Sequence, residues 1–484
     1  MGYHGPKSIT GETLMLPLVE LPEIVSHYAP WFEPVFADEE ALIQFQRYLS
    51  GLLVSENKTV EGINRLVVYE NRNQSSLNRL LTDNPFSEIG LNGQRLALLD
   101  SLPGTRMKPK GVLSVDDTLL AHYGQHFDEI AKLWDPVEER YVWAHNLVNL
   151  HYSDNQTDYP VLYQLWRPAD LEKLEQGLPA AQVKLRSSKF ALKKTNPKKW
   201  KQYLTSLWSR HQNKPKVVAL YQSKLLIARQ LLSRFAADYP SLKLPVTFDN
   251  WYTQPAFCRF LDQELKLPYV GTLARDNEVI LKSGREMIDA FAKRLKQEHL
   301  ETVKTGNKPL FRQITISYKG QKERYYSYCR TLRIHNFGKQ RIVINHRQAD
   351  LSDKPVYYNS NRLYWQASGI TRIRRHRWPV EVYHQEGKAE GLDQYQIRDF
   401  QAISKHIGLV AVTYSLLRAA PHDPALLHKL QRHLKYELDG SVPFWRRTTQ
   451  AQSLWNLAAL IAAGLAQGQS LDQVLSPLLA AVYV

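Results

Sequence analysis

The N-terminal part of the chain places its hydrophobic side chains with the period of an α-helix. In Glu39–Leu49 the apolar residues recur every three or four positions, and Asn73–Leu81 and Leu91–Leu102 continue the same spacing. This pattern predicts a helical N-terminal region over residues 1–108, with helices from about residue 10. It contains no clear helix-turn-helix signature, so DNA binding and a packing or oligomerisation role both stay open.

The pattern changes at Gly111, where shorter apolar runs typical of β-strands begin. Acidic residues come directly after two of these runs, Asp116 and Asp117 after the first and Asp249 after the last. The alternation of strands with a helix indicates a mixed α/β segment. The predicted elements are strands at Val112–Val115, Trp143–Tyr152, Tyr159–Trp166 and Leu244–Phe248, and a helix at Val218–Ala236.

Residues 268–370 are rich in β-forming sequence. Phe311–Tyr318, Glu323–Ile334 and Gln340–Asn345 alternate well enough to be antiparallel strands. Basic residues and tyrosines recur among them, and two interpretations stay open. The region is either a sheet with a charged outer face that protects its edges, or a platform that faces DNA.

After Pro379 the chain becomes helical again, and Ala402–Leu417 and Leu454–Ala466 are apolar enough to be buried helices. Leu454–Ala466 is the longest apolar run and is too short to span a bilayer. The two cysteines, Cys258 and Cys329, exclude a disulfide scaffold and a cysteine-rich zinc site. No apolar signal core appears at the N-terminus, so the sequence predicts a cytoplasmic protein without a membrane partner.

The charge balance indicates a polyanionic partner. The chain has 63 Lys and Arg against 47 Asp and Glu, which gives a net charge of +16 and favours nucleic acid. Lys184–Lys201 is a basic stretch that contains no acidic residue. It includes the candidate DNA-binding residues Lys193, Lys194, Lys198 and Lys199.

A carboxylate lies between two cations on a predicted helix in the segment after residue 376. Arg377 precedes Glu381 by four residues and Lys388 follows it by seven, so all three side chains are expected on one helix face. Such a carboxylate can bind a metal ion while its neighbours hold phosphates. The alternative is a solvated helix with ordinary ion pairs.

Three acidic positions occur at comparable points of the predicted fold. Asp116 or Asp117 and then Asp249 end strands, and Glu381 opens a helix. Strand ends are where open α/β sheets place their sites, and carboxylates that converge there need cations between them. Two Mg²⁺ ions would serve, which is the arrangement of phosphodiester chemistry. Taken singly, each Asp is more commonly a turn residue or a helix cap.

Three blocks of the chain resemble, in order, the motifs of DDE transposases of bacterial insertion sequences. They are Leu113–Thr118, Thr247–Tyr252 and Arg377–Glu381. The subgroup has a β-strand insertion before its last carboxylate and the signature Y-x2-R-x3-E-x6-K, of which Arg377, Glu381 and Lys388 supply the last three positions. Arg374 stands where the signature has Tyr, and the basic residues around it would compensate.

The resemblance implies an α/β fold with an RNase H-like core interrupted by a β-rich insertion. The core would comprise residues 109–267 and 371–420, the insertion residues 268–370, and a helical C-terminal region residues 421–484. Asp116, Asp249 and Glu381 would be the catalytic metal ligands, with Mg²⁺ as cofactor and Mn²⁺ as a substitute. We prefer Asp116 as the metal ligand. The alternative, Asp117, would point to the opposite face of the strand and cap a turn.

The resemblance also implies an activity and partners. The protein would bind double-stranded DNA at transposon ends and at the target, as a homodimer on paired ends, in association with the nucleoid. Arg374, Arg377 and Lys388 would contact phosphate. Two alternatives stay open, a domesticated or inactive relative that only binds DNA, and an RNase H-like nuclease that does not transpose.

Overall fold

The computed structural model describes residues 16–68, 74–431 and 439–483. The chain forms two compact units. The first comprises Met1–Thr105 and Gln385–Val484, and the second comprises Arg106–His384. The first residues of the predicted N-terminal region, Asn73, and residues 432–438 of the predicted C-terminal region lie outside the described residues. In the part of the chain that is described, every helix is too short or too polar to cross a membrane.

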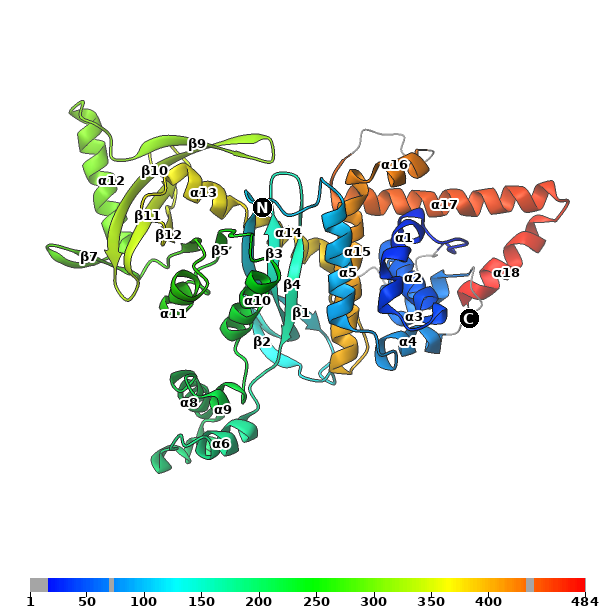
Figure 1. Ribbon diagram of the computed structural model, residues 1–484, viewed down its shortest axis with the longest axis horizontal. Helices are drawn as coiled ribbons and strands as arrows, with labels where there is room; N and C mark the ends of the chain where they lie inside the picture. The colour runs from blue at the N-terminus through cyan, green and yellow to red at the C-terminus, as the bar shows by residue number, and fades with distance from the viewer. Residues whose placement is uncertain (1–15, 69–73, 432–438, 484) are drawn as a thin grey trace. The chain divides into compact units, whose positions relative to one another are not determined.

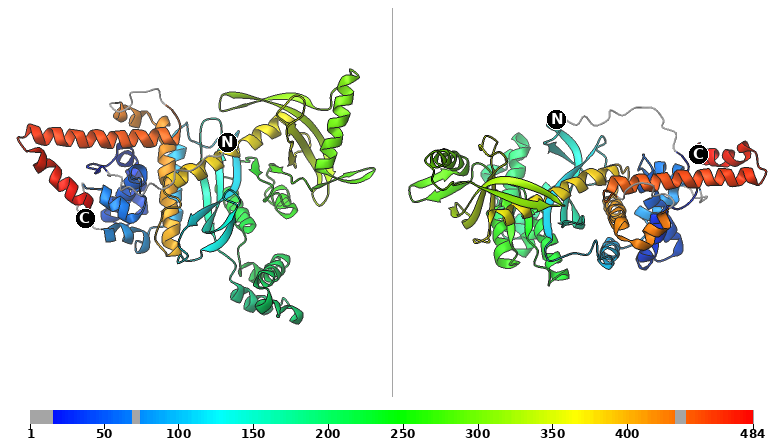
Figure 2. Two further views of the ribbon diagram at one scale, coloured as in Figure 1. Left: turned by 180° about the vertical axis from the view of Figure 1, so that it is seen from behind. Right: turned by 90° about the horizontal axis from the view of Figure 1, so that it is seen from above.

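The first unit is helical, and its centre is α15 (Phe400–Ala419), whose side chains are mostly buried. Helix α15 packs on α5 (Glu88–Ser101) and α2 (Glu39–Val54), as the views in Figure 2 show. The predicted helices at Glu39–Leu49 and Ala402–Leu417 are thereby confirmed. The other helices are α1 (Glu23–Tyr28), α3 (Val60–Leu66), α4 (Gln74–Thr82), α16 (Pro424–Leu430), α17 (Val442–Ala466) and α18 (Leu471–Tyr483), with 3-10 turns at Ala29–Val35 and Ala420–His422.

The second unit is built on one mixed sheet, shown in Figure 1. Its strand order is β2-β3-β1-β5-β6-β12-β11-β10-β7-β8, with β4 also paired to β3 and β9 to β10. Only β1–β5 and β5–β6 pair in parallel among the described strands. The strands are β1 (Val112–His122), β2 (Ala131–Asp135), β3 (Arg140–Ser153), β4 (Asp158–Trp166), β5 (Val246–Phe248), β6 (Tyr269–Thr272), β7 (Glu278–Leu281), β8 (Gly284–Met287), β9 (Arg312–Tyr318), β10 (Gln321–Ile334), β11 (Gly338–His346) and β12 (Val356–Ser360).

Strand β1 does not end at Asp116 and Asp117, so that prediction was wrong. It continues to His122 because β3 pairs with it along its whole length, as far as His122 with Trp143. On its other side, β1 pairs with β5 only as far as Val115 with Phe248. The acidic pair therefore lies in the middle of β1, at the level where the neighbouring parallel strand stops.

The helices of the second unit include a small group inserted between β4 and α10 (Lys224–Asp238). Helices α6 (Leu171–Ala180), α8 (Pro197–Arg210) and α9 (Pro215–Val218) share their own hydrophobic cluster. The helix predicted over Val218–Ala236 is interrupted, because α10 begins only after Ser223, which caps it through the N–H of Leu226 at 3.3 Å. The remaining helices are α7 (Leu192–Thr195), α11 (Pro255–Arg259), α12 (Ile288–Lys304), α13 (Ala367–Arg375) and α14 (Trp378–Ala389), with short turns at Ser187–Lys189 and Phe260–Glu264.

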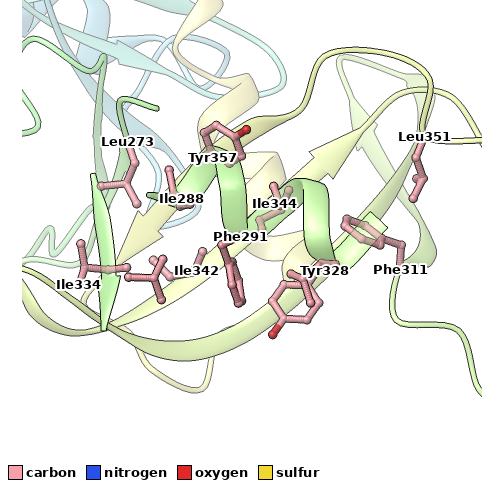
Figure 3. Close-up of a cluster of buried hydrophobic side chains, with 13 residues drawn as sticks. Leu273, Ile288, Phe291, Phe311, Tyr328, Ile334, Ile342, Ile344, Leu351 and Tyr357 are labelled. Atoms are coloured by element: carbon pink, nitrogen blue, oxygen red, sulfur yellow. The ribbon is translucent and has the colours of Figure 1, made fainter. Parts of the chain in front are cut away.

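The β-rich segment has its own hydrophobic core, shown in Figure 3. Ile288 and Phe291 of α12 pack with Tyr328 and Ile334 of β10 and Ile342 of β11 in one buried cluster. The three strands predicted in this segment are confirmed as β9, β10 and β11. Helix α12 was not predicted, although its buried residues recur every three or four positions.

Candidate active site on the face of strands β1 and β5

Asp116 and Asp249 come together because β1 and β5 run in parallel. The register pairs Ser114 with Thr247 and Val115 with Phe248, so one residue further it sets Asp116 beside Asp249. Paired residues of parallel strands point to the same face of the sheet. The negative charge of Asp249 is close enough to raise the pKa of Asp116. The two carboxylates therefore share one site.

The turn between α13 and α14 is held over this face by two serine hydroxyl groups. Ser114 Oγ of β1 and Ser153 Oγ of β3 both donate to the backbone carbonyl oxygen of His376, at 3.2 and 2.9 Å. Ser114 precedes Asp116 by two residues, so both side chains project to the same face of β1. Residue 377, next in the chain, is consequently placed above Asp116.

Arg377 connects Asp116 with Glu381. One terminal nitrogen of its guanidinium donates to Asp116 Oδ2 and the other to Glu381 Oε1. The side chains of Arg377, Asp116 and Glu381 are 15%, 14% and 31% exposed, so water screens these ion pairs only in part. An ion pair between Arg377 and Glu381 belonged to the alternative interpretation of this segment, and Arg377 lies in the turn before α14 rather than on the helix.

Arg374 and Lys388 have different surroundings. Partly buried Arg374 donates from Nε to Thr272 Oγ1 at 2.9 Å. Burial, reinforced by Arg377, lowers its pKa to about 10, while Asp116 and Asp249 act in the opposite direction. The positive charge of Arg374 therefore interacts with Asp116 and Asp249. Lys388 lies in the last turn of α14 and belongs to the first unit.

Asp116 loses its proton less readily than a free aspartate, in spite of its contact with Arg377. Burial raises its pKa to about 6, Arg377 opposes the shift, and Asp249 and Asp117 add to it. A carboxyl group whose pKa is raised in the folded protein favours the neutral form there. Burial therefore favours either the neutral form of Asp116 or a cation held close to it.

Replacing Asp116 with asparagine should stabilise the metal-free protein at pH 7.5 but much less at pH 4.5. The pKa of Asp116 is about 6 when folded and about 3.9 when unfolded, so the folded state binds more protons between these values. Stability then falls as the pH rises through this window, by roughly 2–3 kcal/mol in total. Urea denaturation in EDTA should give a gain of roughly 2–3 kcal/mol at pH 7.5 and about 1 kcal/mol at pH 4.5. An equal gain in stability at both pH values would contradict a raised pKa of Asp116 in the folded protein.

Asp117 points to the opposite face of β1 and has three partners there. It accepts hydrogen bonds from Asn146 Nδ2 at 2.7 Å, Lys224 Nζ at 2.9 Å and Tyr252 Oη at 2.8 Å. It does not cap a turn, because the strand continues past it. Asp249 accepts from the backbone N–H of Tyr252 at 3.2 Å, so Asp117 is tied to the loop that carries Asp249.

The carboxylates have the donor chemistry that a divalent cation requires. Asp116, Asp249 and Glu381 offer only hard oxygen ligands, which suit Mg²⁺. Throughout the described ranges, no group of three or more His, Cys, Asp or Glu side chains is arranged to hold a metal ion. The guanidinium of Arg377 instead stands between Asp116 and Glu381. The residues thus fit the metal chemically, with Arg377 at present in the position of the cation.

Basic side chains gather next to the acids. A cavity of about 430 Å³ is lined by Arg374, Arg375 and Arg377 together with Arg347 of the β-rich segment and the half-exposed Trp378. The predicted basic stretch lies elsewhere in the chain, on α7 and α8. The candidate DNA-binding residues within it, Lys193, Lys194, Lys198 and Lys199, are all exposed, and Lys193 pairs with Glu175 at 2.9 Å.

Several residues of the site were not predicted from the sequence. Ser153 and His376 are far apart in the chain and carry no recognisable signal. Ser114 has a weak one, since it lies two positions before Asp116 on a predicted strand and must share its face. Tyr252 and Lys224 hold Asp117 from two different elements, so spacing along the chain does not reveal them.

Asp116 on β1 and Asp249, directly after the adjacent parallel strand β5, thus accompany a turn that carries Arg377. The chain belongs to the DDE superfamily endonuclease family, whose model matches residues 32–290, more than half of the chain. The match includes Asp116, Asp117 and Asp249 and ends before Glu381.

None of the curated proteins compared with the chain matches it. Among solved structures, the chain is similar to piggyBac transposase in a cryo-EM structure of its synaptic complex with hairpin DNA. The sequence identity is 12% and the TM-score 0.35, over 90% of this chain and 78% of that chain. A likeness at this level does not assign a fold.

Proposed function

We propose that the protein is a DDE transposase that binds the terminal inverted repeats of its element, cleaves DNA there and joins the freed 3′ end to target DNA. One observation carries the proposal. Asp116 on β1 lies near Asp249, which directly follows the adjacent parallel strand β5, and Glu381 is joined to Asp116 through Arg377. Membership in the DDE superfamily endonuclease family agrees with it.

In this proposal, residues 109–267 and 371–420 form an RNase H-like core and residues 268–370 the β-rich insertion of the bacterial insertion-sequence subgroup. Support comes from the chain order, since β7 to β12 and α12 all lie between Asp249 and Glu381. Residues 1–108 and 421–484 would be helical regions at either end. The departure at Arg374 is accommodated, because its guanidinium remains near Asp116 and Asp249.

Asp116, Asp249 and Glu381 would hold Mg²⁺, with Mn²⁺ as a substitute. When bound, two such ions would activate the attacking oxygen and stabilise the leaving oxygen of the phosphodiester. Arg377 would turn from the carboxylates to a DNA phosphate, which its planar fork suits. Arg374 and Arg375 line the same cavity and would hold the strand, and Lys388 would add a point charge.

Double-stranded DNA would be the partner, at the transposon ends and at the target. The net charge of +16 and the exposed lysines of α7 and α8 favour contact with the phosphate backbone. A homodimer on paired ends would bring two active sites to the two ends of one element. The nucleoid would be its place in the cell.

The proposal is tested with the inverted repeats that flank the gene, carried on a supercoiled plasmid. Purified protein should nick the repeats with Mg²⁺ or Mn²⁺, stay inactive in EDTA, and join the ends to a second plasmid. Binding without nicking would indicate an inactive relative. Nicking without joining would indicate a nuclease that does not transpose. Either outcome would reject the proposed function.

A further inference from the structure

A second basic cavity, separate in its lining from the acidic site, lies in the β-rich segment. Its volume is about 710 Å³, and its lining includes Lys308, Arg312, Arg330 and Arg341. None of the described residues that line it is acidic. Lys308, Arg312 and Arg341 have no acidic neighbour in this lining, while Arg330 also borders a neighbouring cavity that Glu286 and Glu298 line. This excess of positive charge favours an anion over a network of ion pairs.

The cavity opens where the sheet has a gap. Strand β9 pairs with β10 only as far as Arg312 with Ser327, and β7 pairs with β10 only at Arg333 and Ile334. Between these points, no described strand covers this edge of β10. Arg312 and Arg330 border the gap, and both side chains are exposed. Their charges are consequently available to a ligand from solvent.

Helix α13 begins at this cavity and adds to its positive potential. Gln366, Ala367 and Ser368 belong to the lining, and the side chain of Gln366 makes no capping hydrogen bond. The first N–H groups of a helix have no partner within it and attract negative charge. Arg341 is fixed beside the helix start, since its Nε donates to the carbonyl oxygen of Trp365 at 2.9 Å.

We propose that this cavity binds the phosphate backbone of DNA at a point away from the cleaved bond. The inference rests on the proposed function for the identity of the ligand as DNA. Helix α13 has 9 residues and ends two positions before Arg377, so it spans about 13 Å from the cavity to the catalytic turn. Phosphates of one DNA strand are about 3.4 Å apart along the axis. DNA whose axis runs along α13 would therefore place the phosphate in the cavity about four nucleotides from the scissile bond.

The contact is measured by the salt dependence of DNA binding in EDTA. The probe is a fluorescein-labelled 30-base-pair duplex of arbitrary sequence, and the variant is Arg312→Gln/Arg330→Gln. Each lost phosphate contact lowers the slope of log K against log salt by about 0.9. The variant should therefore have a slope smaller by about 2 and bind roughly 60-fold more weakly at 0.1 M KCl, with little difference near 1 M.

The matched control is Arg333→Gln/Lys339→Gln. These two exposed cations lie on the same β10–β11 hairpin, outside the cavity lining, and their loss changes the net charge equally. The control should bind within about twofold of wild type. An equal loss in both variants would show a diffuse basic surface, and no loss in the cavity variant would show that no phosphate binds there. Either result overturns the inference, once circular dichroism melts show that both variants are folded.

The two proposals fail in different ways. If wild type binds DNA through the cavity but does not nick the inverted repeats, the proposed function fails and the cavity stands. If the wild type nicks the repeats and the cavity variant binds DNA like wild type, only the proposal for the cavity fails. In the repeat DNA, one phosphate about four nucleotides from the cleaved bond can be replaced by a neutral methylphosphonate. This change should weaken DNA binding by the wild type and should not further weaken DNA binding by the cavity variant.

Discussion

Replacing Asp249 with asparagine should reduce the rate of Mg²⁺-dependent nicking about 10³-fold and leave DNA affinity within about threefold. The substitution removes one negative charge from the face that Asp249 shares with Asp116. The remaining Oδ1 can still accept the N–H groups of Trp251 and Tyr252, at 3.1 and 3.2 Å in the native protein, so the loop should keep its fold. Single-turnover nicking of a plasmid that carries the inverted repeats measures the rate, and fluorescence anisotropy in EDTA measures the affinity.

The control for Asp249→Asn is Asp276→Asn. Asp276 is an exposed acid in the connection between β6 and β7, so its loss changes the net charge equally. It should nick like wild type. If the Asp249 variant kept more than about a tenth of the wild-type rate, Asp249 would not belong to the catalytic group.

Several helices and most strands follow from patterns that act over a few residues. Glu39–Leu49, Ala402–Leu417 and the strands β9 to β11 are amphipathic or apolar enough to be predicted without tertiary information. Strand β1 shows where this fails. Its second half, Asp117–His122, is polar and mixed, and it is extended only because β3 pairs with it. Pairing with the separate strand β3 therefore determines the length of β1, which the local sequence pattern does not predict.

The candidate acids were predicted from their order in the chain, but their arrangement was not. Nothing in the sequence sets the register that places Asp116 beside Asp249, because β1 and β5 are more than 100 residues apart. The spacing of Arg377 and Glu381 predicted that their side chains lie on one face, with an ion pair as the alternative to a metal site. It gave no indication that the same guanidinium also reaches Asp116. Arg374 was expected at a phosphate, and the structure adds its bond to Thr272. Side-chain partners that lie on other elements can be identified only from the folded structure.

Replacing Arg377 with glutamine should lower the stability of the metal-free protein and increase the stabilisation that Mg²⁺ gives. Arg377 is the cation that neutralises Asp116 and Glu381, and the variant leaves both charges facing Asp249. Removing one partner of a fully buried ion pair costs about 3–5 kcal/mol, and these side chains are partly exposed, so we expect about 2 kcal/mol. Thermal unfolding in EDTA measures this loss.

The response to Mg²⁺ separates a structural role of Arg377 from competition with the metal. If the guanidinium and Mg²⁺ use the same carboxylates, removal of Arg377 should tighten Mg²⁺ binding about tenfold, which adds about 1.4 kcal/mol of stabilisation at saturating Mg²⁺. The control is Arg375→Gln, which breaks the ion pair of Arg375 with Glu323 at 2.9 Å and leaves the acidic site intact. It should show the wild-type response. If 10 mM Mg²⁺ raised the melting temperature of both variants by the wild-type amount, Arg377 and the metal would not share ligands, and Asp116 and Glu381 would lose their role as a metal-binding pair.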